Sequence, residues 1–234
     1  MTRELSRLLD AQAILCHSSR LLIDPNRRPR TLTSVPAEVD GTVIPGNRDL
    51  PPEEVRRRIR AYWLPYHRTI ARAIAAFRRR GRIPAIVAVH SFTPKLNGGE
   101  PRPWHVGVLW RGDDRLSRPA LAALEARGDL VVGDNRPYSG LFHLGYTVEF
   151  HAQRARLPHV VFELRQDLIA DADGARRFAQ VLAEVLEGPL ADPDLYTLFG
   201  GGDWMLAPVG LHEETGEGRK ALSWHRILQH LNWV

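Results

Sequence analysis

The chain has 234 residues, of which 44% are hydrophobic and 25% charged, the balance of a globular protein with one packed core. No apolar run is long enough to cross a bilayer, no signal-peptide pattern precedes Cys16, and this single cysteine excludes an intrachain disulfide. The net charge is +5, but no nucleic-acid-binding motif accompanies the arginines, so we expect a cytoplasmic protein that binds neither membrane nor nucleic acid.

The first third of the chain predicts short strands, a loop and a long helix. Ala13–Cys16 and Leu21–Ile23 are apolar runs that we expect to be strands. Residues 31–50 are rich in Pro, Gly, Asn and Asp, which is typical of an ordered loop. The Pro-Pro-Glu-Glu sequence at residues 51–54 begins a helix, which we expect Pro65 to kink or split.

The remainder alternates predicted strands with predicted helices, a pattern that favours an α/β domain. The expected strands are Ile83–Val89, Trp104–Trp110, Leu130–Val132, Tyr146–Phe150 and Val160–Leu164. Ser117–Arg127 and Ala175–Leu186 have the apolar spacing of helices. After Pro189 the sequence becomes polar and rich in glycine. We therefore expect a domain of residues 1–190 followed by an extension of residues 191–234.

Two residues in this pattern could carry chemistry. His90 follows an apolar run, at the end of a strand where open α/β sheets bind ligands, and a neutral imidazole there can ligate zinc. It could equally cap the strand. Glu163 lies within an apolar strand, where burial would raise its pKa and suit it to act as a general base. The alternative for Glu163 is a structural salt bridge with Arg165.

Two polar clusters could bind an anion. Arg20 and Arg27 flank a short apolar run, and their guanidinium groups are suited to clamp a carboxylate. The alternative for both arginines is a surface ion pair with Asp24. Asn135 and Tyr138 lie in a polar segment after a strand, where they could form a turn or donate hydrogen bonds to an oxyanion.

Over residues 5–190 the order and text of these segments resemble the N-formylglutamate amidohydrolase family. The segments are SRLLIDPNR (19–27), IPGN (44–47), PYH (65–67), HSFTP (90–94), RPWH (102–105), GDN (133–135), PYS (137–139), His151 and ELRQDLI (163–169). The resemblance implies a three-layer α/β/α sheet domain similar to the zinc carboxypeptidases, with a phosphorylase/hydrolase-like fold. It also implies hydrolysis of an N-formyl or similar N-acyl amide on an acidic amino acid, a reaction used in histidine degradation.

The resemblance implies a role for each candidate residue. His90 corresponds to a zinc ligand, and Glu163 corresponds to the general base that acts on zinc-activated water. The positions expected to line the substrate pocket are Arg20, Arg27, Asn135, Tyr138 and Arg165. The implied cofactor is zinc, and the implied partner is a small acidic amide.

One departure from the family bears on activity. Members begin with a strand and a Glu-His-Ala-Ser-like motif that supplies early metal ligands, and nothing similar precedes Arg3. His212-Glu213-Glu214, in the unmatched tail, is a poor replacement because catalytic zinc needs three convergent ligands. We expect a domain that lacks the family's N-terminal strand, either a truncated hydrolase or a non-catalytic homologue that binds acidic small molecules or a protein partner.

Overall fold

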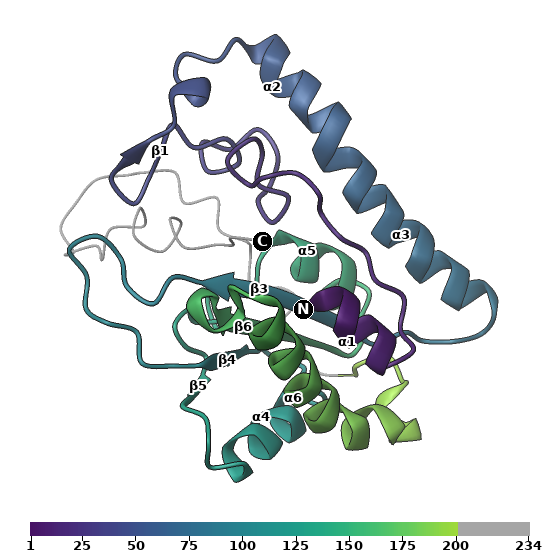
Figure 1. Ribbon diagram of the computed structural model, residues 1–234. Coiled ribbons are helices and arrows are strands. Elements are labelled where there is room, and N and C mark those ends of the chain that lie inside the picture. Colours follow the sequence, from purple (N-terminus) through teal and green to yellow (C-terminus); the bar gives the residue numbers. More distant parts are fainter. Residues whose placement is uncertain (201–234) are drawn as a thin grey trace, which may run out of the picture.

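The computed structural model describes residues 1–200, which build a four-stranded mixed sheet with helices on both faces (Figure 1). The strands lie in the order β3-β6-β4-β5, and their bounds are β3 Ile86–Phe92, β4 Val106–Leu109, β5 Val132–Asp134 and β6 His159–Arg165. Strand β6 pairs parallel with β3 and antiparallel with β4, and β4 pairs parallel with β5. A separate hairpin joins β1 (Glu38–Val39) to β2 (Thr42–Val43).

The other regular elements within residues 1–200 are helices and helical turns. The α-helices are α1 Thr2–Leu8, α2 Pro52–Arg58, α3 Leu64–Arg79, α4 Ser117–Ala126, α5 Tyr146–Val148 and α6 Ala172–Ala191. Two π-helical turns, η2 Ile59–Trp63 and η3 Glu149–Gln153, continue α2 and α5. The 3-10 turns are η1 Pro45–Asn47, η4 Gln166–Ile169 and η5 Pro193–Leu195.

The two faces of the sheet pack against different helices because successive strand residues point to opposite sides. On one face Phe162 and its neighbours pack against α1, α4 and α6, which lie together in front of the sheet in Figure 1. On the other face Phe92 and Val161 pack against α3 and α5. The expected α/β class is therefore confirmed, with the sheet between two layers of helix.

The two expected N-terminal strands are absent from the structure. Ala13–Cys16 and Leu21–Ile23 are irregular or turn segments. The carbonyl of Leu21 accepts a hydrogen bond from the side chain of Asn47, and the carbonyl of Leu22 accepts one from Arg58. Side chains from loop and helix, rather than a neighbouring strand, therefore satisfy this backbone.

The expected strand at Tyr146–Phe150 is also wrong, because this segment is helical. Asn26 caps its first turn. The backbone carbonyl of Asn26 accepts a hydrogen bond from the amide of Tyr146, and its side chain accepts one from the amide of Thr147. The apolar pattern suggested a strand, but a side chain 121 positions earlier in the chain caps the segment as a helix.

Other boundaries shifted by a few residues. Pro65 lies at the start of α3, directly after the π-helical turn Ile59–Trp63, so the regular α-helix is interrupted before Pro65 while the chain stays helical through Arg79. Helix α6 continues through Pro189 to Ala191, so it crosses the expected domain boundary, and Leu195 still packs in the core. No helix within residues 1–200 is long and apolar enough to span a membrane. His212 and its neighbours lie outside the described residues.

Candidate active site

Glu163 and His90 meet on one face of the sheet. The two residues are register partners on the parallel strands β6 and β3, so their side chains leave the sheet on the same side. This is the face that packs against α3 and α5, because Val161 and Phe92, two positions along each strand, both belong to that core. The strand extends two residues beyond His90, which is therefore within β3 rather than after it.

Glu163 is fully buried, and neither of its carboxylate oxygens has a hydrogen-bond partner within residues 1–200. Burial raises the pKa of this carboxyl well above its usual value, while nearby Arg20, Arg102 and Arg27 act in the opposite direction. The alternative interpretation of Glu163, a salt bridge with Arg165, is wrong, since Arg165 pairs with Asp167 at 2.9 Å. Burying an acid without a hydrogen-bond partner costs free energy of folding, so such a residue is a candidate for a functional role.

A glycine beside Glu163 lets a loop pack directly on the sheet. Gly107 on β4 is the register partner of Glu163, on the side opposite His90. A Cβ at Gly107 would lie only 1.8 Å from the carbonyl oxygen of Arg136, so the loop after β5 rests directly on the strand backbone. Tyr138 belongs to the same loop, and its pKa is raised by burial and, to a smaller extent, by the charge of Glu163.

Arginines supply positive charge around this acid. Arg20 forms an ion pair with Asp24 at 2.8 Å, as the alternative interpretation expected, but both side chains are buried rather than on the surface. Arg27 is 4% exposed and forms no ion pair with any residue of 1–200, and burial lowers its pKa to about 10. Asp24 therefore balances at most one of two buried guanidinium groups.

Arg102 is a site residue that the candidate set omitted. Its Nη1 donates to the hydroxyl oxygen of Tyr138 at 3.2 Å, and its charge acts on Glu163. It comes from the loop between β3 and β4, which also returns the chain from His90 toward Gly107. The available signal was its position in the RPWH segment, one of the motifs shared with the family.

Asn135 and Arg165 have structural contacts of their own. The side-chain oxygen of Asn135 accepts hydrogen bonds from the amides of Trp110 and Gly140, so it stabilises the loop that carries Tyr138. Arg165, at the end of β6, also donates to the carbonyl of Pro103. These contacts engage Asn135 and Arg165 with the surrounding loops.

The donors near His90 do not make a zinc site. No group of three or more His, Cys, Asp or Glu side chains that could hold a metal ion occurs within residues 1–200. Catalytic zinc takes three protein ligands and one water. The residues in this part of the chain therefore do not fit the implied zinc ion.

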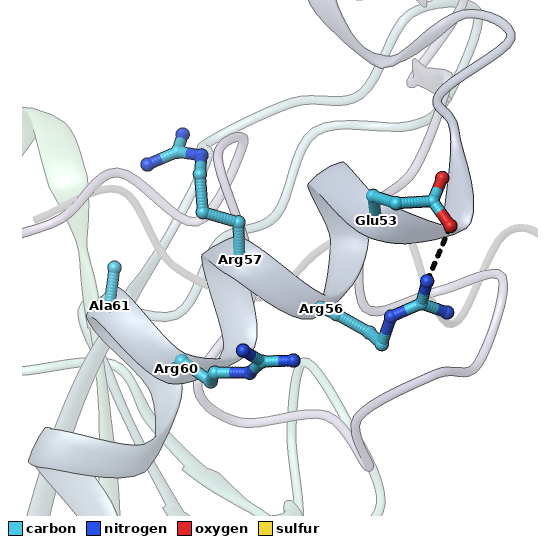
Figure 2. Close-up of a pocket in the computed structure, with 5 residues that line it drawn as sticks. All are labelled: Glu53, Arg56, Arg57, Arg60 and Ala61. Atoms are coloured by element: carbon cyan, nitrogen blue, oxygen red, sulfur yellow. Dashed lines mark hydrogen bonds and ion pairs between the residues drawn. The ribbon is translucent and has the colours of Figure 1, made fainter.

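A hollow of about 510 Å³ lies on the surface of the long helix. It is lined by Glu53, Arg56, Arg57, Arg60 and Ala61, which Figure 2 draws as sticks. All five belong to α2 and η2, and Arg56 and Arg57 pair with glutamates one turn earlier. None of the candidate residues lines it, so this solvated helix surface is separate from Glu163.

Comparison with known proteins identifies relatives. The family model described as N-formylglutamate amidohydrolase matches residues 1–170. The N-formylglutamate deformylase of Pseudomonas aeruginosa is 29% identical over 206 residues, covering 78% of this chain and 76% of that protein. The crystal structure of gene product Atu2144 from Agrobacterium tumefaciens is 34% identical, with a TM-score of 0.71, and the match covers 81% of this chain and 74% of that one.

Proposed function

The chain belongs to the N-formylglutamate amidohydrolase family, and on that premise we propose that it hydrolyses the N-formyl, or a similar N-acyl, amide of an acidic amino acid such as N-formyl-L-glutamate. The name of its Pseudomonas aeruginosa relative supports the deformylation of this substrate. The resemblance to zinc carboxypeptidases and the cytoplasmic location are further parts of the same proposal.

The observation that carries this proposal is the unbalanced charge around Glu163. Arg20, Arg27 and Arg102 all act on this one buried acid, whereas Arg27 has no carboxylate partner within residues 1–200. A substrate carboxylate would supply the missing negative charge, and guanidinium groups bind carboxylates with strong, directional hydrogen bonds. An acidic amide therefore suits this site better than a neutral one.

Glu163 is the proposed acid and base of the reaction. Its raised pKa allows the carboxylate to take a proton from the attacking water and return it to the leaving amine. The water oxygen forms a bond to the formyl carbon, and the C–N bond then breaks to release formate and the free amino acid. Arg102 and Tyr138 are assigned to stabilise the oxyanion, because they are hydrogen-bonded to each other near Glu163.

The family resemblance also implies that the reaction depends on zinc, with His90 as one of its ligands. Residues 1–200 contain no group of three potential ligands, so the steps above involve protein side chains alone. The metal content of the purified full chain, measured by elemental analysis, tests this part separately from the reaction.

The test of the proposed reaction is formate release from N-formyl-L-glutamate by the full-length protein and by Glu163→Gln. We expect turnover by the wild type and a fall of at least about a hundredfold in kcat for the variant, the usual contribution of a general base. Equal rates for the two proteins would remove Glu163 from the reaction. No formate release by the wild type would contradict the proposed activity.

The second candidate is a non-catalytic domain that binds acidic small molecules, and the lack of a fitting zinc ligand set within residues 1–200 favours it. Both candidates use the same arginines. The non-catalytic domain predicts that glutarate raises the unfolding temperature although no formate is released. Formate release that Glu163→Gln abolishes would rule this candidate out.

A further inference from the structure

Three side chains of the long helix hold the loop that carries the site arginines. Arg58 Nη1 donates to the carbonyl of Leu22 at 2.9 Å, and Trp63 Nε1 donates to the carbonyl of Arg27 at 3.1 Å. His67 Nε2 lies 2.9 Å from the carbonyl oxygen of Pro25. All three contacts are to backbone atoms of residues 20–27, the segment bounded by Arg20 and Arg27.

The π-helical turn explains how one helix can make all three contacts. In a regular α-helix, a separation of five residues leaves Arg58 and Trp63 about 140° apart around the axis. A π-helical turn contains about one extra residue, and η2 (Ile59–Trp63) lies between these two side chains, so it removes most of that offset. His67 then follows Trp63 by four residues, about 40° further round. The three side chains therefore face the same loop.

The hydrogen bonds of His67 identify its tautomer. The carbonyl of Pro25 can only accept, so Nε2 of His67 carries a proton and donates it. Nδ1 of His67 lies 2.9 Å from Nε2 of His151, a residue of the second π-helical turn, η3. With His67 neutral, Nδ1 accepts from His151. The ring of Trp63 packs on the ring of His67, with 3.9 Å between the ring centroids, so each ring limits the movement of the other.

The opposite side of the same loop is also fixed. The side chain of Asn26 accepts from the amide of Thr147, and its backbone carbonyl accepts from the amide of Tyr146. A Cβ at Gly145 would lie 2.2 Å from the Asn26 side chain, so the two segments are in close contact. The loop that ends at Arg27 is thus held between the long helix and the start of α5, and the His67–His151 contact joins α3 to η3, the turn that continues α5.

We propose that Trp63 and His67, brought to one side of the helix with Arg58 by the π-helical turn, are positioning residues that hold Arg27 where it binds the side-chain carboxylate of the substrate. Neither residue touches the substrate. This inference rests on the proposed function, because it concerns how the same site selects acidic substrates. Its consequence is that removing a single donor weakens recognition of the carboxylate without removing the group that binds it.

The first test is Trp63→Phe, which keeps an aromatic ring and removes the donor to Arg27. We expect KM for N-formyl-L-glutamate to rise on the order of fivefold with kcat nearly unchanged, because ground-state and transition-state binding are lost together. KM for N-formyl-L-glutamine, whose side chain has no charge, should stay as it is. Tyr62→Phe is the matched control, since it alters the same π-helical turn and its hydroxyl contacts Arg57 instead.

The second test compares His67→Gln with His67→Leu. The Gln amide can donate to Pro25 in place of Nε2, and Leu cannot. We expect Gln to keep a KM within about twofold of the wild type and Leu to reproduce the effect of Trp63→Phe. An equal rise in KM for both substrates would overturn the inference. So would an unchanged KM in variants whose unfolding transition shows that they are folded.

Calorimetric binding of glutarate separates this inference from the proposed activity. If the wild type binds glutarate but releases no formate, the proposed activity is contradicted. The inference then requires weaker binding by Trp63→Phe and His67→Leu, with unchanged binding by Tyr62→Phe. Equal glutarate binding by all four proteins would contradict it. A wild type that binds no glutarate would contradict both.

Discussion

At the scale of single residues, burial sets the chemistry of the site. Glu163 has a raised pKa because it is fully buried, and the arginines around it only partly oppose this effect. Arg27 has a lowered pKa, near 10, for the same reason. A buried acid with a raised pKa and an arginine without a carboxylate partner within residues 1–200 lie in the same site, which therefore suits a ligand that brings negative charge.

The stability of Glu163→Gln tests whether this acid is functional or structural. We expect the free energy of unfolding near pH 7 to stay within about 1 kcal/mol of the wild type or to rise, because no hydrogen bond to Glu163 is lost and no charge need be buried. Urea unfolding monitored by circular dichroism measures it. A loss above about 2 kcal/mol would show that the carboxyl anchors the fold.

The family resemblance implied that His90 and Glu163 act on the same water, and the structure places the two residues as register partners on neighbouring strands. The sequence could not reveal that Arg102 and Tyr138 are hydrogen-bonded to each other, since loop packing decides which side chains meet. The sequence also could not predict that Arg165 would form its ion pair with Asp167 rather than with Glu163. The chemical roles of His90, Glu163 and the expected pocket residues remain predictions.

At the scale of elements, the helices and central strands follow from apolar spacing, whereas the irregular segments depend on distant partners. The strands β3, β4 and β6 and the helices α4 and α6 were predicted from periodicity within a few residues. The segments around Leu21 and Tyr146 were mistaken for strands, because their backbone groups bond to Asn47, Arg58 and Asn26. No local pattern in the sequence marks those contacts.

Gly107→Ala should disrupt the loop that carries Tyr138. The added Cβ would meet the backbone oxygen of Arg136 at 1.8 Å, so either the loop or β4 must move, at a cost of at least about 3 kcal/mol. Gly188→Ala in α6 is the matched control, because nothing lies within 4 Å of its Cβ and helix propensity favours Ala by about 0.5–1 kcal/mol. Similar unfolding temperatures for the two variants would refute the close approach at Gly107.

The His67–His151 contact should make stability depend on pH. Burial lowers the pKa of His67 to about 4, so the neutral ring contributes stability that is fully present above about pH 6.5 and is lost as the pH falls toward 4. A shift of this size corresponds to about 3 kcal/mol. We expect the destabilisation caused by His67→Gln to be smaller at about pH 5 than at pH 7.5 in urea titrations. A difference that does not vary with pH would contradict the buried neutral histidine.

At the scale of the whole molecule, two groups of arginines within residues 1–200 could attract an anion. One is the exposed face of α2, where the hollow of Figure 2 lies among arginines paired with glutamates. The other is the buried group around Glu163, between the sheet and the loop of residues 20–27. Only the buried group combines unmatched charge with exclusion of water, which strengthens electrostatic binding.

Glutarate should therefore stabilise the folded protein through the buried arginines. At a concentration about a hundred times its Kd, we expect a gain of about 2.7 kcal/mol in the free energy of unfolding. Arg27→Met should lose this gain, and a triple substitution of Arg56, Arg57 and Arg60 by Ala should keep it. Thermal shift assays over a glutarate series measure all three proteins. Loss of the gain in the triple variant alone would move the anion site to the helix surface.

The crystal structure of Glu163→Gln soaked with N-formyl-L-glutamate would test the account most directly, because the variant should bind the substrate without consuming it. We expect the substrate's side-chain carboxylate on Arg27, and its formyl carbon within reach of Gln at position 163, about 3 Å directly or through one water. A substrate bound in the hollow on α2, or one whose formyl group points away from β6, would contradict the account.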